Sequence, residues 1–162
     1  GMGSLQALSK VLQVAQCGDY LLNAGVVGAL NNAVEVEHSY LIEKVGKYQP
    51  SKELIGNKAL SFGERLFPDL STKDQGLRLL TSDFPFYHES LKKKCEGKWD
   101  LVDMEGYGIA HAASLLELPL TMLKVVSDFA DNNTKKAIMQ NFDRLSKVIA
   151  KQVKKWIEDN GF

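Results

Sequence analysis

Residues 120–126 are the most restrictive segment of this 162-residue sequence, a run that is apolar except for one threonine and one lysine. Such a near-continuous apolar run predicts a strand that is buried on both faces. A strand of this kind needs helices on both sides of its sheet. A serine and an aspartate follow directly, so polar side chains stand at the carboxyl end of the strand. The segment therefore predicts an α/β domain.

The rest of the sequence alternates between strand and helix patterns. Strands are expected at residues 20–24, 34–45, 77–81, 99–103 and 120–126, and helices at residues 4–17, 105–116 and 141–160. Gly25 and Gly28 predict a tight turn after the first strand, and Asn141 is expected to cap the last helix. Residues 89–95 fit a short polar helix or a loop, and residues 46–76 fit a loop with short elements. No repeat or linker divides the chain, so residues 1–162 are expected to form a single domain.

The composition narrows the possible classes of function. The 20 basic and 20 acidic residues give no net charge, which argues against electrostatic capture of nucleic acid or of an anionic membrane. No apolar run is long enough to span a bilayer and no signal peptide is recognisable, so a soluble cytoplasmic protein is expected. Cys17 and Cys95 lack metal-ligand or CxxC spacing and predict free thiols. Neither a metal nor a cofactor is expected.

Two carboxylates stand where predicted strands end. Glu105 follows the strand at 99–103, and Asp128 follows the strand at 120–126. Because ligands bind outside the carboxyl ends of strands in open α/β sheets, both side chains are candidates for ligand binding and proton transfer. The alternative gives them local roles, Glu105 as an acid in the first turn of a helix and Asp128 as a turn former. The residues alone leave both interpretations open.

Six landmarks follow one another along the chain. They are GMG at residues 1–3, NAGVVGAL at 23–30, TSD at 81–83, VDMEG at 102–106, SDFAD at 127–131 and the final helix from Asn141. In this order they resemble the nucleoside phosphorylase and nucleosidase superfamily, and within it most closely the 5′-methylthioadenosine/S-adenosylhomocysteine nucleosidases and the futalosine hydrolases. The resemblance covers most of the chain except residues 46–76. It implies a three-layer α/β/α fold with a mixed central sheet.

The resemblance also implies a role for each residue that matches a family motif. Asp128 is expected to be the general acid that protonates the purine leaving group, and Ser127 to help place it. Glu105 is expected to accept hydrogen bonds from the ribose 2′- and 3′-hydroxyls, with Met104 packed against the sugar. Backbone groups near Gly28 are expected to line the sugar side, and Phe84 or Phe86 to be the ring that stacks on the base. Val26 and Ala130 are the remaining expected substrate-binding residues.

These residue types suit cleavage of an N-glycosidic bond, which passes through an oxocarbenium-like state. A carboxylate at the ribose hydroxyls stabilises the developing cation. An acid near purine N7 neutralises the departing base, provided that burial keeps the acid protonated at pH 7. The implied activity is hydrolysis of a purine nucleoside that carries a 5′ substituent, with release of free purine and the modified ribose.

Three departures from the family pattern bear on the reaction. Phosphorylases of the superfamily hold phosphate with an arginine and a serine or threonine where this chain has Asn23 and Val26, so hydrolysis is favoured and phosphorolysis is the weaker alternative. Lys124 stands where the family often has an arginine, and it keeps the charge without the planar fork. The sequence begins at the glycine turn, without the earlier family strands that carry the water-activating glutamate. We therefore expect an N-terminally truncated form of the fold.

Two hypotheses of function follow. The first is a nucleosidase whose partner is a small purine nucleoside. The second is a non-catalytic purine- or nucleoside-binding protein, or an inactive truncated homologue. Because absent strands would expose a sheet edge and apolar surface, a homodimer or larger assembly is expected.

Overall fold

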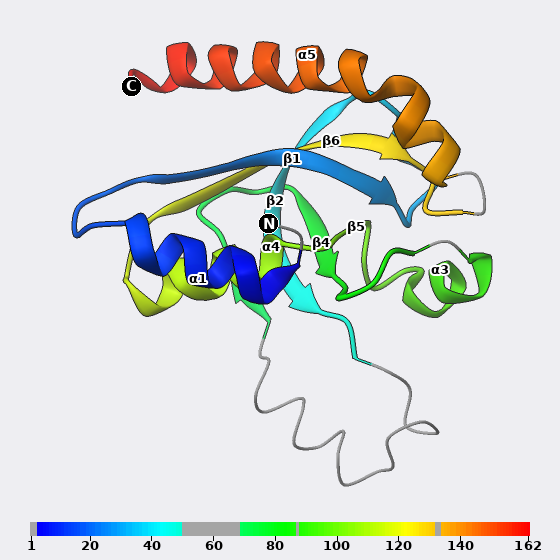
Figure 1. Cartoon of the computed structure of the whole chain (residues 1–162), viewed down its shortest axis with the longest axis horizontal. Helices are drawn as coiled ribbons and strands as arrows, with labels where there is room; N and C mark the ends of the chain where they lie inside the picture. Colours follow the sequence, from blue (N-terminus) through cyan, green and yellow to red (C-terminus); the bar gives the residue numbers. More distant parts are fainter. Residues whose placement is uncertain (1–2, 50–68, 87, 132–133) are drawn as a thin grey trace, which may run out of the picture.

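The computed structural model describes residues 3–49, 69–86, 88–131 and 134–162. Its helices are α1 (Ser4–Val14), α3 (Glu89–Cys95), α4 (Gly106–Leu115) and α5 (Thr134–Asn160). Its strands are β1 (Leu21–Ala29), β2 (Ser39–Lys47), β3 (Leu70–Ser71), β4 (Leu77–Thr81), β5 (Leu101–Asp103) and β6 (Leu120–Asp128). Strands and helices interleave along the chain, which confirms the α/β class (Figure 1).

The strands form one mixed sheet in the order β3-β2-β4-β5-β1-β6. β1 runs parallel to β6, and β4 runs parallel to both β2 and β5, whereas β5 is antiparallel to β1. Residues 39–41 of β2 also pair with β6 in the antiparallel sense. The strands β2, β4, β5, β1 and β6 therefore form a closed sheet, because β6 pairs with β2 as well as with β1. The short β3 pairs with β2 and lies outside this closed part.

Helices cover the sheet on two sides (Figure 1). α5 contacts β6 and β1 on one side, while α4 packs against the sheet on the other and α1 packs against α4. β6 is buried at all nine of its positions, as its apolar run predicts. The layered arrangement of helices around a mixed sheet is the one that the sequence predicts.

Gly108 sets how closely α1 approaches α4. A Cβ atom added to Gly108 would lie 1.9 Å from the carbonyl oxygen of Ser4, a distance that no side chain tolerates. The glycine therefore allows the start of α1 to cross α4 with the two backbones in contact. Because α4 begins just after β5, this contact brings Gly3 and Ser4 to the carboxyl end of that strand.

Several predicted boundaries are wrong. Gly25 and Gly28 lie inside β1 instead of forming a turn, because β1 pairs with β6 along its length and this pairing overrides the low strand propensity of glycine. Asn141 lies inside α5 rather than at its N-cap, because the helix already begins at Thr134. The packing of α5 on β6 outweighs the preference of asparagine for a cap position.

Smaller differences concern strand lengths. β2 begins only at Ser39, after a turn in which Glu37 has a φ of 66°. β5 is confined to Leu101–Asp103, two residues shorter at its start than predicted. Residues 50–68 of the predicted loop and residues 1–2 of the GMG turn lie outside the described residues, and Gly3 is the N-cap of α1.

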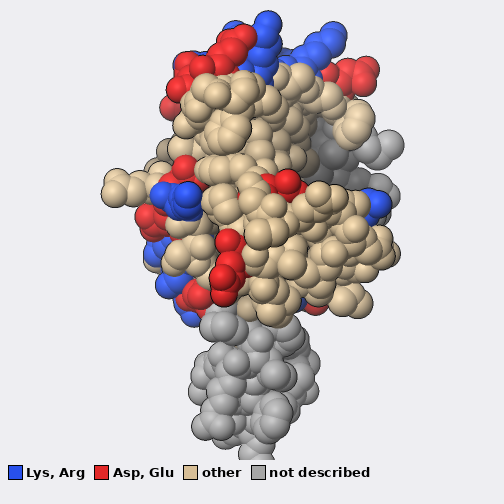
Figure 2. Space-filling view, turned by 90° about the vertical axis from the view of Figure 1, so that its left-hand side faces the viewer, with Lys and Arg blue, Asp and Glu red and all other residues tan. Residues whose placement is uncertain are grey.

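Charge is mixed on the face of the molecule that Figure 2 shows. On the face shown in Figure 2, acidic and basic side chains of the described residues lie interspersed, including those of α5 at the top. This face of the described part lacks the single-sign patch that electrostatic binding of nucleic acid uses. No described helix is long and apolar enough to cross a membrane. Across the described ranges, no group of three or more His, Cys, Asp or Glu side chains could hold a metal ion.

Candidate active site

A cavity of about 450 Å³ opens at the carboxyl ends of β1, β5 and β6. All nine residues that the sequence nominates for the site line it, although they come from four separate segments of the chain. They are Val26, Gly28, Phe84, Phe86, Met104, Glu105, Ser127, Asp128 and Ala130. The structure therefore brings the predicted residues together around one space large enough for a small ligand.

Asp128 is the last residue of β6 and is only 5% exposed. Its Oδ1 accepts hydrogen bonds from the Ala130 amide at 2.7 Å and from the Thr134 hydroxyl at 2.6 Å. Its Oδ2 lies 2.5 Å from the Ser127 hydroxyl. These contacts fix the orientation of the carboxyl group at the wall of the cavity.

Ser127 can accommodate Asp128 with or without a proton. The Ser127 hydroxyl lies within hydrogen-bond distance of two oxygens, Asp128 Oδ2 at 2.5 Å and the Val27 carbonyl at 3.1 Å, but it carries a single proton. It donates that proton to a carboxylate when Asp128 is ionised. When Asp128 is protonated, Asp128 donates to the hydroxyl, and the hydroxyl donates to Val27. Such a partner suits a residue that gives up a proton during a reaction.

Gly28 leaves the space that Asp128 and Ala130 occupy. A Cβ atom added to Gly28 would lie 3.0 Å from the Ala130 Cβ, 3.2 Å from Asp128 Oδ1 and 3.3 Å from Val102 Cγ1. These distances are shorter than ordinary contacts to a Cβ atom. The absence of a side chain at this position of β1 therefore keeps β1 and the end of β6 close together at the cavity.

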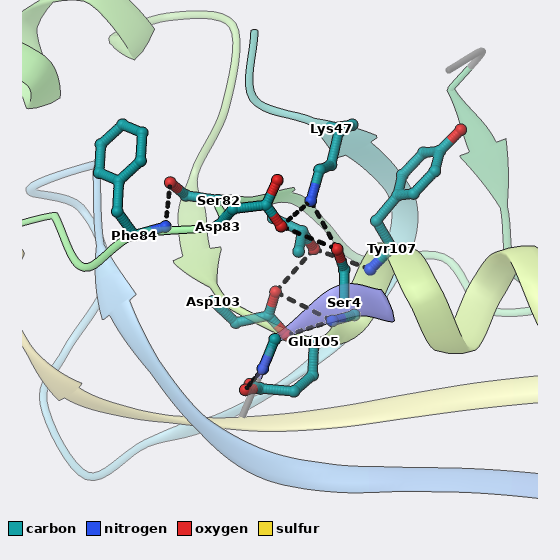
Figure 3. A network of polar contacts seen from close by, with 11 residues as sticks. Ser4, Lys47, Ser82, Asp83, Phe84, Asp103, Glu105 and Tyr107 are labelled. Atoms are coloured by element: carbon teal, nitrogen blue, oxygen red, sulfur yellow. Dashed lines mark hydrogen bonds and ion pairs between the residues drawn. The ribbon is translucent and has the colours of Figure 1, made fainter. Parts of the chain in front are cut away.

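Glu105 lies between β5 and α4, at the N-cap position of α4. Its Oε1 accepts a hydrogen bond of 2.9 Å from the amide of Gly3, the residue that precedes α1. This contact uses one of the two carboxylate oxygens and draws the start of α1 to the edge of the cavity. Figure 3 shows Glu105 beside Ser4 and Asp103 in this polar cluster.

A buried ion pair lies next to Glu105. Lys124 Nζ lies 3.0 Å from Asp103 Oδ2, and the two side chains are only 3% and 2% exposed. Asp103 also accepts hydrogen bonds from the Thr81 hydroxyl at 2.7 Å and from the Gly106 amide at 2.9 Å. Asp103 therefore connects β4, β6 and the first turn of α4 directly next to Glu105.

A second polar network joins β2, the segment that follows β4, and α1 (Figure 3). Lys47 Nζ donates to the Ser4 hydroxyl at 2.6 Å and forms an ion pair with Asp83. The Ser4 hydroxyl also lies 2.9 Å from Asp83 Oδ1. Partial burial acts to raise the pKa of Asp83, but the hydrogen bonds from Lys47 and Ser4 outweigh it and hold this pKa below its ordinary value.

The structure separates the two candidate stacking rings. Phe86 is 4% exposed and belongs to the core cluster around α3, whereas Phe84 is 41% exposed. The two rings stack on each other with centroids 5.9 Å apart, and Tyr48 meets both edge-on. Both rings line the cavity, and Phe84 is the more exposed of the two.

Sequence reasoning missed several residues of the site. Three of them line the cavity, namely Asp103, Thr134 and the exposed Phe142 of α5. Two others, Lys47 and Asp83, form the ion pair of the neighbouring polar network. The sequence does contain a signal for Asp103 and Lys124. Each is a charged residue inside a predicted strand, and charged side chains are rarely buried unless they are paired, so an ion pair between them could have been predicted. The involvement of Thr134 and Phe142 depends on where α5 docks, and no local pattern encodes that.

The described residues that line the cavity include carboxyl groups but no cationic side chain. No Lys, Arg or His is found among the described residues that line it. Val26 presents an apolar side chain that is 37% exposed, and Asn23 does not line the cavity. The described walls therefore offer an anion such as phosphate no cationic partner.

Comparisons with known proteins fit this geometry. A family model described as the phosphorylase superfamily matches residues 78–158, half of the chain. A search of curated proteins found no match.

Solved structures share the fold over nearly the whole chain. A futalosine hydrolase from Helicobacter pylori is 16% identical with a TM-score of 0.83, and the match covers 98% of this chain and 76% of that one. A mutant methylthioadenosine nucleosidase from Helicobacter pylori, with 5′-methylthioadenosine in its active site, is 16% identical with a TM-score of 0.80 and coverages of 98% and 77%. The corresponding nucleosidase from Chlamydia trachomatis is 25% identical with a TM-score of 0.73 and coverages of 98% and 73%.

Proposed function

The chain belongs to the phosphorylase superfamily, and we propose that its cavity binds a purine nucleoside with a 5′ substituent and hydrolyses the N-glycosidic bond. The observation that carries the proposal is the position of Asp128 and Glu105 on the walls of one cavity. The family landmarks nominate these two residues for the acid and for the ribose anchor. The solved structures with this fold include a nucleosidase that holds 5′-methylthioadenosine.

Each of the main lining residues has a role in the proposed reaction. Phe84 stacks on the base, Glu105 accepts hydrogen bonds from the ribose hydroxyls, and Met104 packs against the sugar. As the bond between the sugar C1′ and the purine nitrogen breaks, its electron pair moves onto the purine, and Asp128 donates a proton to N7. The negative charge of Glu105 stabilises the oxocarbenium-like sugar. Water then adds to C1′ and loses one proton to solvent, and Asp128 regains one proton from solvent before the next turnover.

The lining of the cavity favours water over phosphate as the second reactant. Phosphate carries negative charge and is normally held by arginine, lysine or a cluster of amide groups. The described lining contains three carboxylates and no cation, and Val26 offers no hydrogen bond. A phosphate ion would therefore be bound weakly beside Glu105.

A non-catalytic nucleoside-binding role is the second candidate. The three carboxylates in the described lining are Asp103, Glu105 and Asp128. Asp103 is committed to Lys124, Glu105 contacts Gly3, and Asp128 is assigned as the acid. No further carboxylate among the described lining residues is left to activate water. Binding without turnover is therefore the alternative that the product assay must separate from hydrolysis.

We also propose that the protein is cytoplasmic and works as a homodimer or larger assembly. Four exposed apolar side chains lie on or next to the lining of the cavity, namely Val26, Phe84, Phe129 and Phe142. A second copy that covered them would remove apolar surface from water at the mouth of the site. Sedimentation of a single monodisperse monomer at micromolar concentration would contradict the assembly.

The reaction is tested by its products. The protein is incubated with methylthioadenosine, adenosylhomocysteine or futalosine, with and without phosphate, and free base and sugar are separated by chromatography. Hydrolysis predicts free adenine or hypoxanthine and unphosphorylated sugar at a rate independent of phosphate. Release that requires phosphate and yields a sugar 1-phosphate would establish the phosphorylase. Base binding by calorimetry without release would establish the binding protein.

A further inference from the structure

Lys92 differs from its neighbours in the run of three lysines on α3. Lys93 and Lys94 are exposed, but Lys92 is partly buried. Its Nζ donates to the carbonyl oxygen of Phe129 at 3.0 Å and to Asn32 Oδ1 at 3.1 Å, and it lies 5.4 Å from the centre of the Phe129 ring. The ammonium group therefore joins α3 to the loops that follow β1 and β6.

We propose that Lys92 is a positioning residue for Asp128 and acts through the peptide group between Phe129 and Ala130. The carbonyl of Phe129 and the amide of Ala130 belong to one rigid plane. Lys92 holds the carbonyl end of that plane, and the amide end donates the 2.7 Å hydrogen bond to Asp128 Oδ1. Neither end can rotate without breaking the bond at the other.

The conformation of Ala130 shows why this peptide needs support. Its φ of 50° places a non-glycine residue in the left-handed region, which is uncommon and persists only where surrounding contacts enforce it. Lys92 supplies such a contact from another element of the fold. A cation on the carbonyl also polarises the same peptide group, which strengthens its amide as a donor to Asp128.

Lys92 is not among the residues that line the cavity, so it does not touch a ligand there. Its removal should alter the orientation of Asp128 and leave the ribose and base contacts in place. If the proposed function holds, the effect falls on kcat for base release and not on KM. The structural part of the inference stands independently of that function, because the amide of Ala130 can be observed in the free protein.

The test compares Lys92→Met with Lys93→Met, a matched change on the same helix that removes an exposed ammonium group. The first readout is hydrogen exchange of the Ala130 amide by 15N NMR, which requires no turnover. Lys92→Met should speed this exchange about tenfold or more, since a hydrogen bond to a charged group is lost, and Lys93→Met should not change it. Lys92→Arg, which keeps a cationic donor, should restore most of the protection. Lys92→Gln repeats the test if the methionine variant unfolds.

The second readout is base release by the same variants. We expect kcat of Lys92→Met to fall about tenfold with KM within about twofold of the wild type, and Lys93→Met to behave as the wild type. Equal exchange of Ala130 in the Lys92 and Lys93 variants would overturn the inference. Faster exchange with an unchanged kcat would also overturn it. If the wild type releases no base, the exchange data still decide the inference, and only the proposed function fails.

Discussion

Lys124 Nζ lies 3.0 Å from Asp103 Oδ2 in an ion pair whose side chains are only 3% and 2% exposed. The pair joins the end of β5 to the middle of β6, so the strand that precedes Glu105 and the strand that ends at Asp128 are held together next to the cavity. An isolated charge at this depth would be costly, because the interior does not replace its hydration. The geometry of the candidate site therefore depends on both partners.

Removing one charge of this pair should strongly destabilise the fold. Lys124→Met leaves Asp103 buried without its cation and should lower the free energy of unfolding by about 3–5 kcal/mol. Lys44→Met is the matched control, because the Lys44–Asp69 pair has side chains that are 44% and 39% exposed. That change should cost less than about 1 kcal/mol. Denaturant titration measures both, and similar losses in the two variants would contradict the assignment.

A methyl group at Gly28 should damage the site more than the fold. Gly28→Ala places a Cβ atom 3.2 Å from Asp128 Oδ1 and 3.0 Å from the Ala130 Cβ, so Asp128 must move. We expect base release to fall by about tenfold or more. Among the described residues, a Cβ atom at Gly25 of the same strand meets Lys124 Nζ at an ordinary 3.7 Å, so Gly25→Ala should release base as the wild type does. Equal rates of base release for the two variants would be inconsistent with this role of Gly28.

Substitution of Phe84 should reduce ligand binding, whereas substitution of Phe86 should reduce the stability of the fold. Phe86→Ala empties a core position and should cost about 3–5 kcal/mol of unfolding free energy. Phe84→Ala removes a ring that is 41% exposed and should cost much less stability. Affinity for the free base should fall by about 1–3 kcal/mol in the Phe84 variant, the typical worth of stacking on an aromatic ring. The assignment fails if Phe84→Ala binds adenine and hypoxanthine as tightly as the wild type.

Cys95 should make stability depend on pH in the alkaline range. Burial raises the pKa of this thiol from 9.0 to about 11, against the opposing effect of Lys98 and Lys94. The unfolded chain therefore loses the thiol proton first as the pH rises. The stabilising contribution is complete below pH 9 and is lost as the pH rises through about 11.

The effect is isolated by comparing two cysteine variants under reducing conditions. Between pH 9 and 11 the unfolding free energy of the wild type should fall by up to about 2 kcal/mol more than that of Cys95→Ala. Cys17 is exposed, so Cys17→Ala should retain the decline of the wild type. Parallel pH profiles for Cys95→Ala and the wild type would rule out this origin.

Local sequence patterns predicted the parts of the site that depend on one strand at a time. The apolar run at 120–126 predicted β6, and the position of Asp128 just after this run predicted an acid at the end of the strand. Glu105 followed from the same reasoning for β5. Both side chains then meet in one cavity because β5, β1 and β6 are adjacent in the sheet.

Relationships between distant strands were not predictable in this way. The pairing of Ser39 in β2 with Val125 in β6, which closes the sheet, depends on contacts far apart in sequence. The same holds for Lys92, whose role depends on α3 lying beside the loop at Phe129. The choice between Phe84 and Phe86 required knowing which ring the core buries. The predicted turn at Gly25 and Gly28 is wrong because the pairing of β1 with β6 overrides the low strand propensity of glycine.

Replacement of Asp128 by asparagine tests whether this residue is the acid of a nucleoside-cleaving site. Release of base from methylthioadenosine and futalosine is followed in phosphate-free buffer for the wild type and for Asp128→Asn, with nucleoside affinity measured alongside. We expect measurable release by the wild type and a loss of about 10²-fold or more in the variant, with affinity largely retained. Equal rates of release in the two proteins would contradict it.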